Sequence, residues 1–151
     1  MKLLRSLLCV ACWLLLPGLA LAEVKVSGAW IRATVAAQKV TGAFMALASD
    51  KAVSLVSAAS PAAGMVEIHE MRMQGNIMQM RPVERVEVLP GKVTELKPGG
   101  YHIMLMNLAK PLGKGGSVPL MLTFEGADGK KLTVEVQAEV LAPGEDGGHR
   151  H

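Results

Sequence analysis

The C-terminal part of the chain alternates between apolar and polar residues with a period of two. From Lys131 to Val140, Leu, Val and Ala positions are separated by Lys, Thr, Glu and Gln. This pattern is typical of a strand with one buried and one solvated face. Ser117 to Phe124 is predicted as a partner strand, because Asp128-Gly129 supplies the residues of a turn between the two segments.

Further apolar segments predict that the rest of the domain is also all-β. His102 to Leu108 is apolar on both faces, as expected of a central strand. Val66 to Met73 and Ile77 to Pro82 flank Gln74-Gly75-Asn76, which predicts a hairpin. No segment shows a sustained helical period, so the pattern predicts an antiparallel β-sandwich or barrel. Shorter candidate strands are Val24 to Val26, Trp30 to Arg32, Gly42 to Ala48 and Val53 to Ala58.

The first 22 residues have the pattern of a cleavable secretory signal peptide. Lys2 and Arg5 precede an apolar run from Leu7 to Leu16, and Ala20-Leu21-Ala22 supplies the small residues of a cleavage site. The run is shorter than the roughly 20 apolar residues of a membrane span. The part of the run that precedes Cys12 is too short to favour the alternative of lipid attachment at that residue. We therefore expect cleavage after Ala22 and a periplasmic location.

Removal of this segment changes both the charge and the sulfur chemistry of the chain. It leaves 14 basic and 13 acidic side chains, without the positive footprint that a nucleic-acid-binding protein needs. It also removes both cysteines, Cys9 and Cys12, so the mature protein has neither a thiol nor a disulfide. The remaining length fits one domain over residues 23–141, without stable membrane insertion, and a flexible polar tail over residues 142–151.

Two His-x-Met units stand out in a chain with 10 methionines. They are His69-Glu70-Met71 and His102-Ile103-Met104. Since residues i and i+2 of a strand share a face, each unit presents an imidazole and a thioether on the same side. One patch would collect both units if the strand over 102–106 lay beside the predicted hairpin, which the sequence leaves open.

The other methionines divide into hairpin pairs and candidates for core packing. Across the predicted turn, Met71 is expected opposite Met80, and Met73 opposite Met78. Methionine also fills gaps in apolar cores. Packing is the expected role of Met45, Met65 and Met121, and the favoured role of Met73, Met78 and Met106.

The donor types in this set point to a narrow range of chemistry. Thioether sulfur is soft and uncharged, so it suits Cu(I) and is a poor ligand for Zn²⁺, Mg²⁺ or Ca²⁺. A blue-copper centre needs a Cys thiolate, which the mature chain lacks. No nucleophile, acid–base pair or phosphate loop is visible, so we do not expect an enzyme. A structural β-sandwich with a Met-rich core and no metal stays open as an alternative.

The spacing of these residues resembles a known copper-ligand motif. His69, ten residues, Met80, twenty-one residues and His102-Ile103-Met104 are similar to the motif of the periplasmic copper chaperones called PCuAC. The resemblance covers about Val24 to Val140. It also includes Gly28-Ala29-Trp30-Ile31-Arg32, the segments Val66 to Met71 and Pro98 to Met106, and Leu120-Met121-Leu122-Thr123-Phe124.

The resemblance implies a fold, a cargo and a destination. The fold is a cupredoxin-like Greek-key β-sandwich, and the cargo is one Cu(I) per chain held by His69, Met80, His102 and Met104. The destination is the CuA centre of cytochrome c oxidase, often with Sco-type thiol proteins as partners. A monomer is expected, and periplasmic copper storage or tolerance is the alternative function. Separately from the resemblance, Met71 is a candidate auxiliary donor. His149 and His151 are candidates for a weak, separate Cu(II) site in the tail, but a solvated chain end is the favoured interpretation of these two residues.

Overall fold

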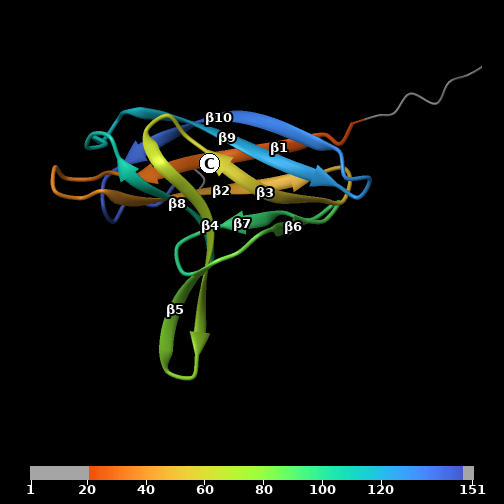
Figure 1. Ribbon diagram of the computed structural model, residues 1–151, viewed down its shortest axis with the longest axis horizontal. Coiled ribbons are helices and arrows are strands. Elements are labelled where there is room, and N and C mark those ends of the chain that lie inside the picture. Colours follow the sequence, from red (N-terminus) through yellow and green to blue (C-terminus); the bar gives the residue numbers. More distant parts are fainter. Residues whose placement is uncertain (1–20, 148–151) are drawn as a thin grey trace, which may run out of the picture.

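The computed structural model describes residues 21–147, which form strands and loops without any helix. Within this range there is consequently no helix long and apolar enough to span a membrane. The predicted all-β class is confirmed (Figure 1). The strands are β1 (Val24–Arg32), β2 (Val40–Ser49), β3 (Val53–Ala59), β4 (Ala63–Gln74), β5 (Ile77–Pro82), β6 (Val86–Val88), β7 (Thr94–Leu96), β8 (Tyr101–Leu108), β9 (Ser117–Gly126) and β10 (Lys131–Leu141).

The strands form one continuous hydrogen-bonded path that folds over into two layers. Its order is β5-β4-β8-β2-β1-β10-β9-β3-β6, and β7 pairs with β2. Side chains from both halves of the path pack in one core, which makes the body a β-sandwich (Figure 1). The pairs are antiparallel except that β1 and β10 run parallel, so the prediction of a purely antiparallel sandwich is wrong at this junction.

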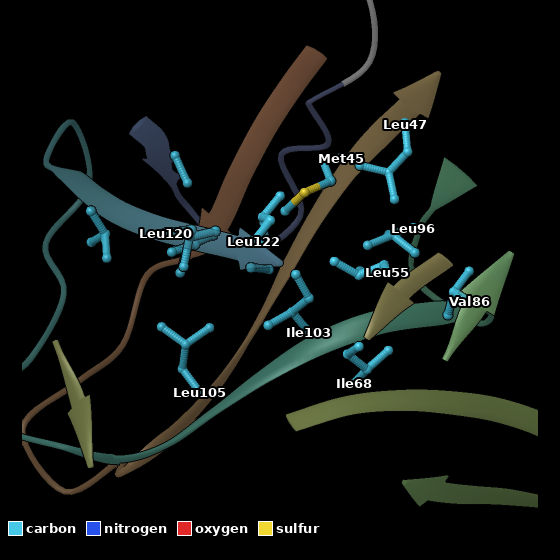
Figure 2. Close-up of a cluster of buried hydrophobic side chains, with 14 of the residues drawn as sticks. Met45, Leu47, Leu55, Ile68, Val86, Leu96, Ile103, Leu105, Leu120 and Leu122 are labelled. Carbon is cyan, nitrogen blue, oxygen red and sulfur yellow. The ribbon is translucent and has the colours of Figure 1, made fainter. Parts of the chain in front are cut away.

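The core separates the two faces of each strand in the predicted period of two. On β8, Ile103 and Leu105 are fully buried, and they pack near Ile68 of β4 (Figure 2). On β10, Ala138 and Val140 are buried while the intervening Glu139 is exposed. His102, Met104 and Met106, on the opposite face of β8, do not belong to this core. The fully buried side chains include Ile31, Leu47, Leu55, Leu96, Leu120, Leu122 and Phe124.

Three local features differ from the expected elements. The two short strands expected near the N-terminus are one strand, β1, whose pairing with β2 shifts register between Ser27 and Trp30. Gly28 has φ 59° at this irregularity, a conformation that glycine adopts without a Cβ clash. The strands β6 and β7 were not expected, because three-residue strands are too short to show a period.

Part of the predicted tail lies against the body. Glu145 accepts hydrogen bonds from Lys114 Nζ at 2.6 Å and from the Ala142 amide at 3.1 Å. The Gly147 backbone lies directly on the Trp30 indole, where a Cβ would clash with the ring. His149 and His151 lie outside the described residues, as do residues 1–20 of the predicted signal peptide.

The hairpin of β4 and β5 projects well beyond the sandwich (Figure 1). Its two-residue turn is Gly75-Asn76, with Gly75 at φ 63° and Gln74 paired with Ile77. Every residue of β5 is exposed. The projecting part of the hairpin is therefore held by its own strand pairing rather than by burial in the core.

Replacement of a fully buried residue on the inner face of β8 tests this assignment of faces. Ile103→Ala should lower the free energy of unfolding by about 2–5 kcal/mol, because it leaves a cavity in the shared core. Val35→Ala, at an exposed position, should change it by less than about 0.5 kcal/mol. Urea denaturation of both variants measures the difference, and equal stabilities would contradict the assignment.

Candidate metal centre

The outer face of β4, β8 and β5 brings together most of the residues singled out in the sequence. β8 lies beside β4, with Ile68 opposite Ile103 on the core side and His69 opposite His102 on the outer side. The strand over 102–106, whose position the sequence left open, pairs directly with the hairpin strand β4. The two His-x-Met units contribute to one surface.

The expected methionine pairs across the hairpin are confirmed. Met71 pairs with Met80, and Met73 pairs with Met78. Met104 lies opposite Gly42 of the next strand, β2, where a Cβ would meet the Phe44 ring at 2.9 Å. Met71, Met80, His102 and Met104 all line one open cleft, together with Arg32 and Phe44.

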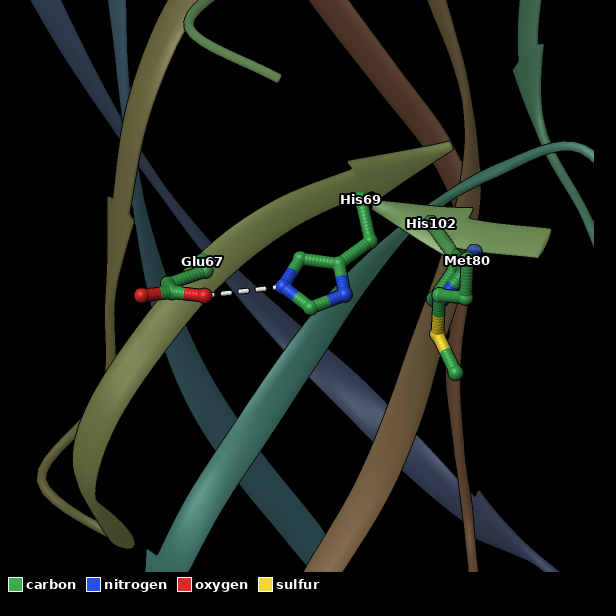
Figure 3. Close-up of polar contacts among 4 residues, drawn as sticks. All are labelled: Glu67, His69, Met80 and His102. Carbon is green, nitrogen blue, oxygen red and sulfur yellow. Dashed lines mark hydrogen bonds and ion pairs between the residues drawn. The ribbon is translucent and has the colours of Figure 1, made fainter. Parts of the chain in front are cut away.

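His102 is buried and held in one tautomer. Its Nδ1 lies 3.0 Å from the Gly100 carbonyl oxygen, which only accepts hydrogen bonds, so Nδ1 carries the proton and donates it. In the neutral ring Nε2 is then a bare lone pair. That nitrogen lies 3.2 Å from Met80 Sδ (Figure 3). Two electron-pair donors thus face one another with no proton between them.

His69 is held in the opposite tautomer by a carboxylate. Its Nε2 donates to Glu67 Oε2 at 2.8 Å, since an ionised carboxylate only accepts. Its Nδ1 is buried and has no hydrogen-bond partner. Figure 3 shows this nitrogen on the side of the ring that faces His102 and Met80. A buried nitrogen left unpaired in this way is uncommon in folded proteins, and a role in binding an ion is one of its ordinary explanations.

One aromatic ring and one cation lie near the His102 imidazole. The ring centroid of His102 is 5.9 Å from that of His69 and 6.2 Å from that of Phe44. The guanidinium of Arg32 lies 5.4 Å from the Phe44 centroid. Burial lowers the pKa of His102, and the charges of His69 and Arg32 lower it further, against the opposing effect of the Gly100 carbonyl. The site therefore favours a neutral imidazole at position 102.

The donor set is imidazole and thioether. Among residues 21–147, no group of three or more His, Cys, Asp or Glu side chains is arranged so that it could hold a metal ion by itself. Each imidazole ring is fixed by a hydrogen bond, His69 by the Glu67 carboxylate and His102 by the Gly100 carbonyl. Metal-ligating histidines are generally fixed in the same way. Imidazole and thioether donors together suit a soft metal ion.

Several residues differ from their expected roles. Met45 is buried as expected, but Met65 is 46% exposed and is not a core residue. Met73 and Met78 are also exposed, so the preference for packing at these positions is wrong. Glu67 was not expected at the site, although its position two residues before His69 places it on the same strand face. Arg32 and Phe44 were missed because they come from strands distant in the sequence.

The fold and the site define a small β-sandwich with an open cleft lined by histidine and methionine. A family model described as "Putative lipoprotein LpqE-like" matches residues 24–138. The chain belongs to this LpqE-like family. It is also 32% identical over 124 residues to the "Putative lipoprotein Lxx21020" of Leifsonia xyli subsp. xyli (strain CTCB07), an alignment that covers 80% of this chain and 74% of the relative.

Solved structures with the same fold include proteins described as copper-bound. The solution structure of CuI-DR1885 from Deinococcus radiodurans is 31% identical, with a TM-score of 0.58 and 78% of each chain covered. The copper-bound PCuAC domain from PmoF2 is 20% identical, with a TM-score of 0.61 over 80% of this chain and 93% of that domain. The apo PCuAC domain from PmoF1 is 22% identical, with a TM-score of 0.62 over 80% and 94%. The expected resemblance to PCuAC domains is confirmed for the fold.

Imidazole ¹⁵N chemical shifts in metal-free protein test the two tautomers. At pH 7.5 we expect His69 to carry its proton on Nε2 and His102 on Nδ1, because Glu67 and the Gly100 carbonyl accept from those atoms. Glu67→Leu should convert His69 to a mixture of tautomers and leave His102 unchanged. Observation of the reverse tautomer at either ring in the unaltered protein would contradict the described site.

Proposed function

We propose that this protein is an extracytoplasmic carrier that binds one Cu(I) through His69, Met80, His102 and Met104. The observation that carries the proposal is the convergence of two unprotonated imidazole nitrogens, His69 Nδ1 and His102 Nε2, toward the Met80 sulfur. A lone pair on each nitrogen and a thioether nearby form a donor set for a soft cation. Met104 lines the cleft with Met80 and His102, and with His69 beside His102 it would complete four donors.

Cu(I) fits this site better than the other common metal ions. Thioethers are uncharged and soft. Among the described residues, the carboxylate that contacts the imidazoles is Glu67, and it accepts a hydrogen bond from His69 Nε2, the ring nitrogen that is not a proposed ligand. The copper-bound state of CuI-DR1885 and of the PmoF2 domain supports copper as the cargo here. Met71 lines the cleft without completing the proposed set, so it serves as a shield or as an auxiliary donor during exchange.

The open cleft suits a protein that passes its cargo on. Met80 is exposed, so an incoming ligand from a partner reaches the metal without unfolding of the carrier. We propose delivery toward the CuA centre of cytochrome c oxidase, with a Sco-type thiol protein as a partner and the carrier acting as a monomer. No catalytic step is part of this function. His149 and His151 stay candidates for a weak Cu(II) site in the tail, with a solvated chain end as the favoured interpretation.

Methionine-to-leucine variants test the proposed ligands. Leucine resembles methionine in volume, so the exchange removes sulfur at a packing cost usually below about 1.5 kcal/mol. Met80→Leu and Met104→Leu should each weaken Cu(I) binding by at least about tenfold, equivalent to about 1.4 kcal/mol. Met71→Leu should have a smaller effect. Anaerobic competition with a Cu(I) chelator measures all three.

Two methionines outside the cleft serve as matched controls. Met45 is buried in the core and Met121 lies on β9, so leucine at either position should leave Cu(I) affinity unchanged. A loss at Met71 as large as the loss at Met80 would mean that the wrong sulfur has been assigned as a ligand. Unchanged affinity in every variant would refute thioether coordination.

The proposed export makes a prediction about the N-terminus of the mature protein. The Glu23 amide nitrogen lies 2.7 Å from Asp50 Oδ1, and Asp50 donates its own amide to the Glu23 carbonyl. Cleavage after Ala22 would turn that nitrogen into an ammonium paired with a carboxylate, a stronger interaction than the hydrogen bond that a neutral amide donates to the same carboxylate. The family and its relative are both described as lipoproteins, which supports an extracytoplasmic location.

Intact-mass analysis of protein from an exporting host should give a chain that begins at Glu23 without modification. In that chain, Asp50→Asn should lower the free energy of unfolding, because the new ammonium loses its charged partner. A mature protein that begins at a lipid-modified Cys12 would contradict the proposed cleavage site while leaving the metal site untouched.

A further inference from the structure

Two methionines at the projecting end of the hairpin lie outside the hydrophobic core. Met73 is 57% exposed and Met78 is 54% exposed. They pair with one another across β4 and β5, two residues closer to the turn than the pair of Met71 and Met80. The proposed Cu(I) site uses neither of them, so their chemistry is unassigned.

The backbone hydrogen bonds place each of these pairs where cross-strand side chains are closest. The Met71 amide donates to the Gly100 carbonyl at 3.0 Å, which directs it toward β8 and away from β5. Met71 and Met80 are therefore a non-hydrogen-bonded pair, with the shorter separation of the two antiparallel types. Stepping two residues along each strand gives the same geometry for Met73 and Met78.

The period of two also keeps charge away from these thioethers. Arg72 pairs with Gln79, and Glu70 pairs with Arg81, on the opposite face of the hairpin. On that face Arg81 Nη2 donates a hydrogen bond to Glu70 Oε2 at 3.0 Å. The methionine face of the hairpin thus presents only soft, uncharged donors from its tip to the cleft.

We propose that Met73 and Met78 form a second, outer Cu(I) site, which exchanges the ion with the cleft by way of Met71 and Met80. This inference rests on the proposed Cu(I) function. The step is a ligand exchange: a Cu–S bond to the outer pair breaks as one to the inner pair forms, with no electron or proton transferred. Two thioethers hold the ion weakly, as a site of entry or departure requires.

The distances along the hairpin suit such an exchange. Successive pairs are two residues apart, which is about 7 Å along a strand. Met80 Sδ in turn lies 3.2 Å from His102 Nε2, so the inner pair already touches the imidazole that would accept the ion. An ion moving from the tip to the cleft would stay within reach of a sulfur ligand.

Titration with Ag(I), a closed-shell substitute for Cu(I), tests the outer site in full-length protein labelled with ¹³C at the methionine methyl groups. The methyl signals of Met80 and Met104 should shift as Ag(I) is added, until one equivalent is present. Those of Met73 and Met78 should shift at or beyond the first equivalent, while Met45 stays unchanged. A Met73→Leu/Met78→Leu variant is compared with a Met45→Leu/Met121→Leu variant, which loses the same number of sulfurs elsewhere.

The hairpin variant should keep its affinity for the first Cu(I) within about twofold and release Cu(I) to a chelator at least about fivefold more slowly than the control variant. Shifts at Met80 and Met104, with none at Met73 or Met78 and equal release rates, would overturn the outer site alone. That result would leave the hairpin tip as a surface for contact with a partner protein. An absence of shifts at all methionines would overturn the proposed Cu(I) function as well.

Discussion

The register between β4 and β8 is the constraint on which the rest of the structure depends. Ile68 and Ile103 face one another in the core, and the next residue on each strand, His69 and His102, faces outward. A slip of one residue in either strand would send its apolar residues to solvent and its imidazole into the core. The burial of Ile103 and Leu105 thus stabilises the fold and at the same time fixes the two histidines on one surface.

Backbone and carboxylate acceptors then set the chemistry of that surface. The Gly100 carbonyl accepts a hydrogen bond from His102 Nδ1, and Glu67 accepts one from His69 Nε2. In each imidazole the other ring nitrogen is left without a proton. The burial of His102 adds to this by lowering its pKa, so protonation of the second nitrogen is disfavoured. The donors of the proposed site are thus fixed in the metal-free protein, which would reduce the reorganisation that metal binding needs.

Local patterns predicted much of this arrangement, and long-range pairing accounts for the remainder. The turn at Gly75-Asn76 fixes the register of its own hairpin, so the opposition of Met71 and Met80 followed from the sequence. The pairing of β4 with β8 joins segments more than 30 residues apart along the chain, and no local pattern specifies it. Arg32 and Phe44 belong to the site for the same long-range reason.

The exposure of individual methionines was also beyond the sequence pattern. An apolar residue in an alternating strand is expected to face the core, yet the outer face of the hairpin carries Met73 and Met78 in solvent. The two faces of β4 are both rich in apolar residues, and only the position of the second layer decides which one is covered. Met65 was assigned to the core for the same reason and lies outside it.

Copper K-edge X-ray absorption of the Cu(I)-loaded protein tests the central claim most directly, because it reports the atoms bound to the metal. We expect nitrogen and sulfur scatterers together, in about equal number, and loss of sulfur scattering in a Met80→Leu/Met104→Leu variant. A shell made only of nitrogen and oxygen scatterers in the unaltered protein would contradict it.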